Sequence, residues 1–216
     1  MHNHSDHEVL PDDDAPLTYY QKLEIAVREL LIEKGLITAD EVRRSVEVMD
    51  ARSPALGAKI VARAWTDSGY KSRLLQNGSA AATELGIEVG VTKLVVVENT
   101  AQVHNLVVCT LCSCYPRMIL GLPPDWYKSK AYRSRAVREP RAVLAEFGTH
   151  IPESVEVRVH DSTATMRYLV LPQRPASTEG MDEEALAALV TRDSMIGVTR
   201  ANAPEASLTG RSSMMN

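Results

Sequence analysis

The segment VVCTLCSCYP, residues 107 to 116, contains all three cysteines of this 216-residue chain. Cys109, Cys112 and Cys114 lie within six consecutive positions, after an apolar β-branched run and before a segment typical of a loop. A single cysteine is most simply a small core residue. Three thiols in one short segment instead indicate a chemical role.

Two familiar kinds of thiol site fit this segment poorly. Cys109 and Cys112 have thioredoxin-like redox spacing, but Cys109 ends a strand-like run instead of opening a helix, and Cys114 would have no part in the motif. Zinc and iron–sulfur sites use four ligands, usually from two loops. The cluster offers three cysteines, and it includes no histidine.

A metal site that also uses the backbone fits better. The three thiolates can fold over one ion, and the amide nitrogens of the adjacent residues Ser113 and Cys114 can enter the same coordination plane. Deprotonation of an amide requires a strongly Lewis-acidic ion. The resulting N₂S₃ donor set leaves one octahedral position open, which suits trivalent cobalt or iron better than tetrahedral zinc. Exposed, metal-polarised thiolates are also prone to oxidation.

The composition is that of a globular protein. Hydrophobic residues make up 44% of the chain and charged residues 24%, and the net charge is −4. This charge gives no electrostatic reason to expect nucleic acid. No apolar run is long enough for a membrane span, and the polar start MHNHSDHEVLPDDD is not a signal peptide. We therefore expect a cytoplasmic protein whose thiols stay reduced unless a metal recruits them.

Helix-starting signals dominate the first third of the chain. Thr18 with Gln21, and Thr38 with Glu41, form capping boxes, and Ser53-Pro54 opens a third helix. Shorter helices are expected over 70–75 and 80–85. After residue 90, strand-like runs occupy 93–97, 105–109, 155–159 and 167–171, with helices expected over 138–148 and 181–190. The pattern predicts an α+β protein.

The domain organisation predicted from these elements has four parts. We expect a disordered His/Asp-rich tail at 1–17, a helical arm at 18–76, an α+β metal-binding catalytic domain at 77–199 and a flexible tail at 200–216.

The cysteine segment resembles the metal-binding loop of the nitrile hydratase α subunit, and that of the related γ subunit of thiocyanate hydrolase. The resemblance covers roughly residues 19 to 199 and includes GAKIVARAWTD (57–67), VENT (97–100), GLPPDWYKSKAYRSRAVREPRAVLAEFG (121–148), YLVLPQRP (168–175) and ALVTRDSMIGV (188–198). It implies the layered α/β sandwich domain of nitrile hydratase α chains behind a helical arm.

The resemblance also implies a ligand set. Cys109, Cys112 and Cys114 would be the sulfur ligands, and Ser113 and Cys114 would supply backbone nitrogens. The position of Cys112 is oxidised to sulfinic acid in the family, and that of Cys114 to sulfenic acid. Thr110 and Tyr115 match the cobalt-type pattern, so low-spin Co(III) is favoured over Fe(III).

The implied activity is hydration of a small nitrile to its amide, with the ion acting as a Lewis acid. Cys112, Ser113 and Cys114 would be the catalytic residues: hydroxide or the Cys114 sulfenate attacks, and the Ser113 hydroxyl can hold a water. In the family two arginines of a β-type subunit contact the oxidised cysteines. We therefore expect an αβ hetero-oligomer and an activator, or cobalt chaperone, that loads the ion.

Further residues are expected near the loop. Asp161 and Arg167 match polar positions close to the metal in the family, with an ordinary ion pair between strands as the alternative. Tyr115 and Trp126 are candidate pocket walls, with core packing as the alternative. A basic run can meet the partner or the oxidised cysteines, or can simply be a solvated helix face; its members are Arg133, Arg135, Arg138 and Arg141.

One departure from the nitrile hydratase pattern concerns Arg117. Nitrile hydratases usually have a tryptophan there, whereas thiocyanate hydrolase also continues with arginine. The longer insertion that thiocyanate hydrolase has before its cysteines is missing from this chain. Nitrile hydratase is therefore the first hypothesis and thiocyanate hydrolase the second. A cobalt-binding metallochaperone without catalysis is a third.

Overall fold

The computed structural model describes residues 16–112 and 114–204, and these residues form parts of two compact units that divide between Glu47 and Val48. Within the described ranges, every helix is too short or too polar to cross a lipid bilayer.

The smaller unit contains α1 (Tyr19–Glu33) and the beginning of α2 (Ala39–Asp50). Both predicted capping boxes are present: the amides of Gln21 and Glu41 donate to the hydroxyls of Thr18 and Thr38, at 3.3 and 3.2 Å. Each threonine amide donates in return to the side chain three residues later. Neither helix buries a residue.

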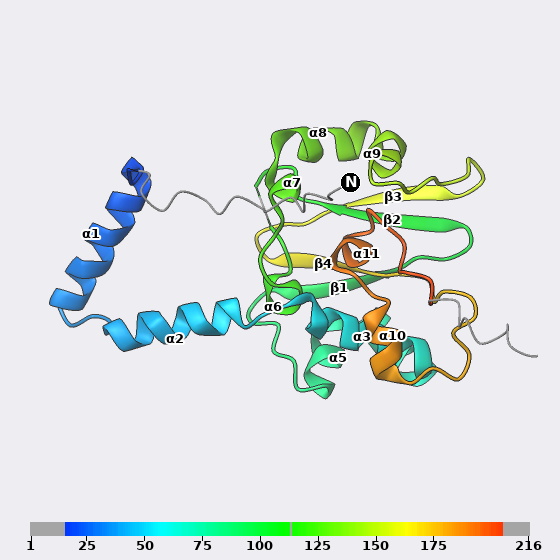
Figure 1. The fold of residues 1–216 in the computed structure, drawn as a ribbon, viewed down its shortest axis with the longest axis horizontal. Helices are drawn as coiled ribbons and strands as arrows, with labels where there is room; N and C mark the ends of the chain where they lie inside the picture. Colours follow the sequence, from blue (N-terminus) through cyan, green and yellow to red (C-terminus); the bar gives the residue numbers. More distant parts are fainter. Residues whose placement is uncertain (1–15, 113, 205–216) are drawn as a thin grey trace, which may run out of the picture. The chain divides into compact units, whose positions relative to one another are not determined.

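The larger unit mixes helices with two short sheets (Figure 1), so the predicted α+β class is confirmed. Its helices are α3 (Pro54–Thr66), α4 (Ser68–Gln76), α5 (Gly78–Glu84), α6 (Arg117–Leu120), α7 (Asp125–Lys128), α8 (Lys130–Arg138), α9 (Pro140–Glu146), α10 (Glu183–Ala188) and α11 (Arg192–Ile196). Its strands are β1 (Lys93–Glu98), β2 (Val103–Val108), β3 (Glu156–Asp161) and β4 (Met166–Leu171).

The strands pair in parallel across long stretches of sequence. β1 pairs with β4, and β2 pairs with β3 in a register that sets Val108 opposite Asp161. The two pairs lie side by side, with β2 next to β4 (Figure 1). Because parallel strands end at a common edge, the segments that follow β2 and β3 are neighbours. This places the cysteine segment, directly after β2, beside the end of β3.

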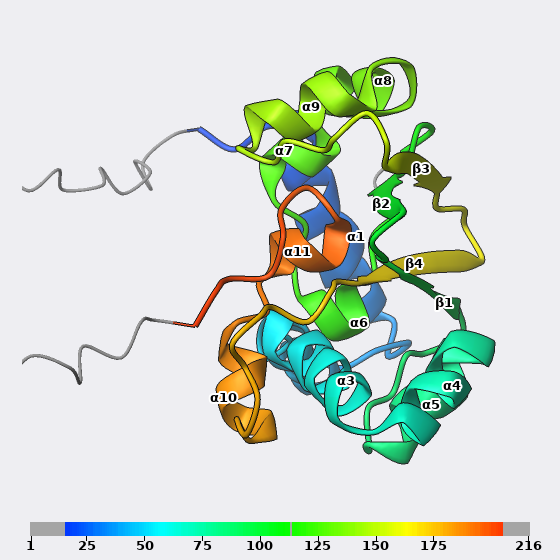
Figure 2. The same cartoon turned by 90° about the vertical axis from the view of Figure 1, so that its right-hand side faces the viewer.

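Helices cover the strand pairs on several sides, which explains why β2 is a nearly continuous buried run. α4 and α5 pack on β1, α8 packs on β2, α9 packs on β3, and α11 packs on β4 and β2 (Figure 2). The main core includes Ile60, Leu106, Leu144 and Met195.

The buried His104 side chain joins β2 to the residues that directly follow β1 and α11. His104 donates through Nε2 to the Gly197 carbonyl at 2.7 Å, and its Nδ1 lies 3.4 Å from the Asn99 amide nitrogen. Gly197 has φ +88°, and a Cβ there would lie 2.0 Å from the Asn105 carbonyl oxygen. Only glycine fits both this backbone conformation and this close approach.

Helices and strands are present at every predicted place, whereas α6, α7, α8 and α11 were not individually predicted. The expected arm, residues 18–76, spans both units, because α3 and α4 contribute buried residues to the larger one. The tails expected at 1–17 and 200–216 lie mostly outside the described residues.

Candidate metal centre

The three cysteines follow β2 with graded exposure. Cys109 is 1% exposed, Cys114 is partly buried and Cys112 is exposed. Leu111, between the first two, is 92% exposed. The segment therefore begins in the core and passes over the protein surface before Tyr115 returns to the interior.

The three sulfur atoms form one cluster. Sγ of Cys112 lies 3.3 Å from that of Cys109 and 3.1 Å from that of Cys114, and all three lie within 4.8 Å of one another. The Cys112 amide also points at the Cys109 sulfur, at 3.3 Å. Three converging thiols are a soft donor set of the kind that binds transition metals. The cluster can therefore hold a metal ion. Ser113 lies outside the described residues, so its predicted role stays a prediction.

The partly buried Cys114 thiol resists ionisation without a cation. Burial, and then hydrogen bonds with Cys112 and Cys109, raise the pKa of Cys114 to about 12, and the charge of Arg167 opposes this rise. A coordinating cation deprotonates a thiol outright. Formation of the thiolate at this position is therefore expected to accompany metal binding.

Asp161 fastens the beginning of the cysteine segment. Its carboxylate accepts hydrogen bonds from the Thr110 amide at 3.0 Å and from the Thr110 hydroxyl at 2.5 Å. The parallel register of β2 and β3 explains this contact, because it sets Asp161 opposite Val108, two residues before Thr110. The structure thus places Asp161 in direct contact with the cysteine segment, and its role at a metal site stays a prediction.

Arg167 interacts with backbone instead of with Asp161. Its guanidinium donates to the carbonyls of Thr163 and Met166. Among the described residues no ion pair joins Arg167 to Asp161, so the alternative of a simple inter-strand pair does not apply. Its charge nevertheless acts on Cys114.

Tyr127 was not singled out from the sequence, yet it contacts the cysteine segment. Its hydroxyl donates to the Cys114 carbonyl at 2.9 Å, and its ring packs edge-on against Tyr115 with centroids 5.0 Å apart. Trp126 packs edge-on against Tyr132 and Phe147. Tyr115 and Trp126 thus belong to an aromatic cluster beneath the segment, and their role as pocket walls stays a prediction.

The basic residues divide according to their partners. Arg133 donates to the Thr110 carbonyl at 3.4 Å, so it reaches the cysteine segment. Arg135 pairs with Glu139 and Glu146, and Arg141 donates to loop carbonyls. Arg117 is exposed at the first position of α6.

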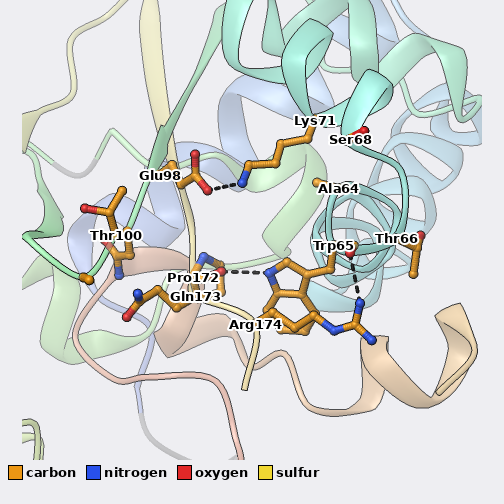
Figure 3. Close-up of a pocket in the computed structure, with 12 residues that line it drawn as sticks. Ala64, Trp65, Thr66, Ser68, Lys71, Glu98, Thr100, Pro172, Gln173 and Arg174 are labelled. Carbon is orange, nitrogen blue, oxygen red and sulfur yellow. Dashed lines mark hydrogen bonds and ion pairs between the residues drawn. The ribbon is translucent and has the colours of Figure 1, made fainter. Parts of the chain in front are cut away.

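A separate polar groove of about 550 Å³ lies at the ends of β1 and β4 (Figure 3). Trp65 donates to the Pro172 carbonyl at 2.8 Å there, and Lys71 pairs with Glu98. Among the described residues, none of the predicted site residues lines it. The cysteine cluster is therefore the stronger candidate for the functional site.

Comparison with known proteins agrees with this choice. The family described as "Nitrile hydratase, alpha chain" matches residues 18–199. The low-molecular-weight cobalt-containing nitrile hydratase subunit alpha of Rhodococcus rhodochrous is 55% identical over 181 residues, covering 83% of this chain and 87% of the relative. Thiocyanate hydrolase subunit gamma of Thiobacillus thioparus is 44% identical over 191 residues, covering 83% and 79%.

A solved structure agrees as well. A double mutant of the Fe-type nitrile hydratase from Comamonas testosteroni Ni1 superposes with a TM-score of 0.79 at 43% identity, covering 91% of this chain and 97% of that chain. The extent of the family match and the level of identity leave one conclusion: this chain belongs to the nitrile hydratase α-chain family.

Proposed function

We propose that this chain is the metal-bearing subunit of a nitrile hydratase that converts a small nitrile to its amide. The observation that carries the proposal is the cluster of three thiols within 4.8 Å, on one segment that Asp161 anchors at the end of two parallel strands. Membership of the nitrile hydratase α-chain family supports nitrile hydration as the reaction.

The proposed cofactor is low-spin Co(III). Cys109, Cys112 and Cys114 would hold it through sulfur, and Ser113 and Cys114 through backbone nitrogen. Thr110 and Tyr115 match the cobalt-type pattern, and the 55% identical relative is named cobalt-containing, although the similar Comamonas structure is of an iron-type enzyme. When bound, the ion would supply Lewis acidity that makes a nitrile carbon electrophilic.

The chain's own residues would hold this segment in place. Asp161 fixes the segment before its exposed part, through Thr110. Tyr127 fixes it after that part, through the Cys114 carbonyl. Contacts of this kind orient metal ligands and tune their basicity. The Ser113 hydroxyl would hold a water, as the family resemblance implies.

We further propose that Cys112 is oxidised to sulfinic acid and Cys114 to sulfenic acid, a four-electron and a two-electron oxidation for which dioxygen or a peroxide would be the oxidant. Oxidation of cysteine follows thiolate character and exposure. The order of exposure agrees, since Cys109 is buried while the other two thiols are more accessible. Mass spectrometry of the metal-replete protein should find two added oxygens on Cys112 and one on Cys114. Unmodified thiols in an active complex would refute this part.

Full activity is proposed to require a β-type partner in an αβ hetero-oligomer, and loading of cobalt to require an activator. The exposure of Cys112 and of Leu111 supports a partner, because the segment is open to water on this chain. Excluding water strengthens the electrostatic interactions at a catalytic centre.

Thiocyanate hydrolase is the second candidate, and Arg117 is the observation that favours it. The exposed Arg117 lies three residues after Cys114, directly after the cysteine segment, and adds a positive charge that suits an anionic substrate. The thiocyanate hydrolase relative, at 44% identity, keeps this alternative open. A cobalt-binding chaperone is a third candidate, which predicts bound metal without oxidised cysteines or turnover.

One experiment separates these candidates. The chain would be co-expressed with its β-type partner and activator in cobalt-supplemented medium, and the purified complex given a simple nitrile and thiocyanate in parallel. Amide from the nitrile, with no attack on thiocyanate, is the expected result. Carbonyl sulfide and ammonia from thiocyanate would overturn it in favour of the second candidate. Metal without either reaction would favour the third.

The matched variant for this experiment is Arg117→Trp. If the chain is a nitrile hydratase, this change should leave amide formation within a few-fold of the original. If thiocyanate is the substrate, losing the cation should weaken its hydrolysis strongly, because attraction between an anion and an arginine is lost. Lys93→Trp, at another exposed cation of the same unit, controls for the added indole.

A further inference from the structure

One face of α8 (Lys130–Arg138) forms a cationic groove beside the cysteine segment. Lys130, Arg133, Ser134, Val137 and Arg138 share this face, since residues three, four and seven positions apart align on a helix. Together with Thr110 they line a groove of about 510 Å³. Among the residues that the structure describes, this lining contains three cations and no carboxylate.

The cations of this groove differ from the other arginines nearby. Arg135, on another face of α8, is neutralised by Glu139 and Glu146. Lys130, Arg133 and Arg138 form no ion pair with any described residue, and Arg138 donates only to the Ser134 carbonyl within its own helix. The positive charge of this face is therefore uncompensated by the rest of the described chain.

Two further observations indicate that the groove lacks a binding partner within the described part of this chain. The Arg133 Nε is buried but has no hydrogen-bond partner among the described residues, although Nη1 of the same side chain reaches Thr110. A buried donor without an acceptor is costly. Val137 lies in the middle of this face and is 46% exposed. It therefore offers a partner an apolar contact surrounded by the charged side chains of the groove.

We propose that this groove is a docking site for an acidic segment of the β-type partner, one that brings aspartate or glutamate side chains against α8. The inference rests on the proposed function for the existence of the partner. Charge complementarity identifies the occupant: carboxylates would neutralise the three cations. The groove is continuous with the cysteine segment through Thr110, so the same contact would bring the partner to the edge of the metal centre.

The test measures binding of the two subunits, without reference to turnover. Purified chain with its metal and the purified β-type partner would be titrated by calorimetry at low and at high salt. Lys130→Glu combined with Arg138→Glu reverses two exposed charges of the groove. Lys59→Glu combined with Lys93→Glu makes the same change of charge at two exposed lysines outside the groove, and serves as the matched control.

The expected result is a Kd at least about tenfold weaker for the α8 variant, with a smaller dependence on salt, and little change for the control. Circular dichroism would verify that both variants fold. Equal weakening in both variants, or none in either, would overturn the docking proposal. If inorganic phosphate binds the α8 groove while the Kd of the partner is the same for the α8 variant and the unaltered chain, the site is a general anion site and the assignment of a protein occupant is wrong.

The proposed function can fail separately. A complex that forms through α8 but hydrates no nitrile would refute the function and leave the docking site intact. A complex that hydrates nitriles and whose affinity does not change with the α8 charges would refute the docking site and leave the function intact.

Discussion

The contact between Asp161 and Thr110 is expected to set how firmly the cysteine segment holds its metal. Asp161→Ala removes the acceptor of two hydrogen bonds, one from the Thr110 amide at 3.0 Å and one from its hydroxyl at 2.5 Å. A hydrogen bond to a charged group contributes roughly 1.5–3 kcal/mol. Asp161 is exposed, so competition from water reduces this value, and we expect about 2 kcal/mol for the two bonds together.

This loss should appear as weaker metal retention. If most of the free energy serves to order the segment for binding, about 2 kcal/mol corresponds to roughly a 30-fold loss of affinity, since about 1.4 kcal/mol is a factor of ten. Changes to residues that support metal ligands typically cost about 10- to 100-fold. The cobalt content of the purified subunit, and its loss to a chelator over time, would be measured.

Three companion variants sharpen the test. Thr110→Val removes only the hydroxyl, so it should lose about half of the effect, and the double variant should equal Asp161→Ala alone, because both partners belong to one interaction. Glu156→Ala removes an exposed carboxylate at the other end of the same strand and should retain cobalt normally. Retention of cobalt by Asp161→Ala equal to that of the unaltered chain would refute the anchoring role.

Three other outcomes are expected. Tyr127→Phe removes the hydrogen bond to the Cys114 carbonyl and should destabilise the segment by about 1 kcal/mol, seen as faster loss of cobalt while the melting temperature of the fold shifts by only a few degrees. Gly197→Ala should lower the free energy of unfolding by about 3 kcal/mol or more in urea titrations, because a Cβ would meet the Asn105 carbonyl at 2.0 Å; an unchanged urea midpoint would contradict the packing described for α11. Burial lowers the pKa of His104 in the folded state below its ordinary value of 6.5, so the unfolded chain binds the proton more readily and stability should fall as the pH drops from 7.5 to 5.5. His104→Gln should flatten this dependence and His150→Gln, at an exposed histidine, should not; equal slopes in all three proteins would remove His104 as its cause.

Local features of the sequence were sufficient to predict the helix starts and the grouping of the three thiols. The boxes at Thr18 and Thr38, and Ser53 ahead of Pro54, involve residues within four positions of one another, so their hydrogen bonds form wherever the helix forms. The three thiols lie on one short segment for the same reason: their convergence requires only a turn of the backbone.

The short helices could not be predicted in this way. α6, α7 and α11 have four or five residues each, which is too little for a helical period to appear in the pattern. They form because their apolar side chains, such as Ile119, Tyr127 and Met195, are buried against the rest of the core. Packing, and not local propensity, sets their position.

Contacts between distant parts of the chain depended on the tertiary structure alone. Asp161 reaches Thr110 across 51 positions because β2 and β3 pair in parallel. No local signal in the sequence shows that β2 pairs with this distant strand and not with a neighbouring strand in a hairpin. The basic residues also look alike in the sequence. In the folded chain Glu146 neutralises Arg135, whereas Lys130 and Arg138 stay exposed beside the cysteine segment. The physical reason is common to both cases: residue types and their spacing determine which groups can bind an ion, while burial and strand register determine which groups meet.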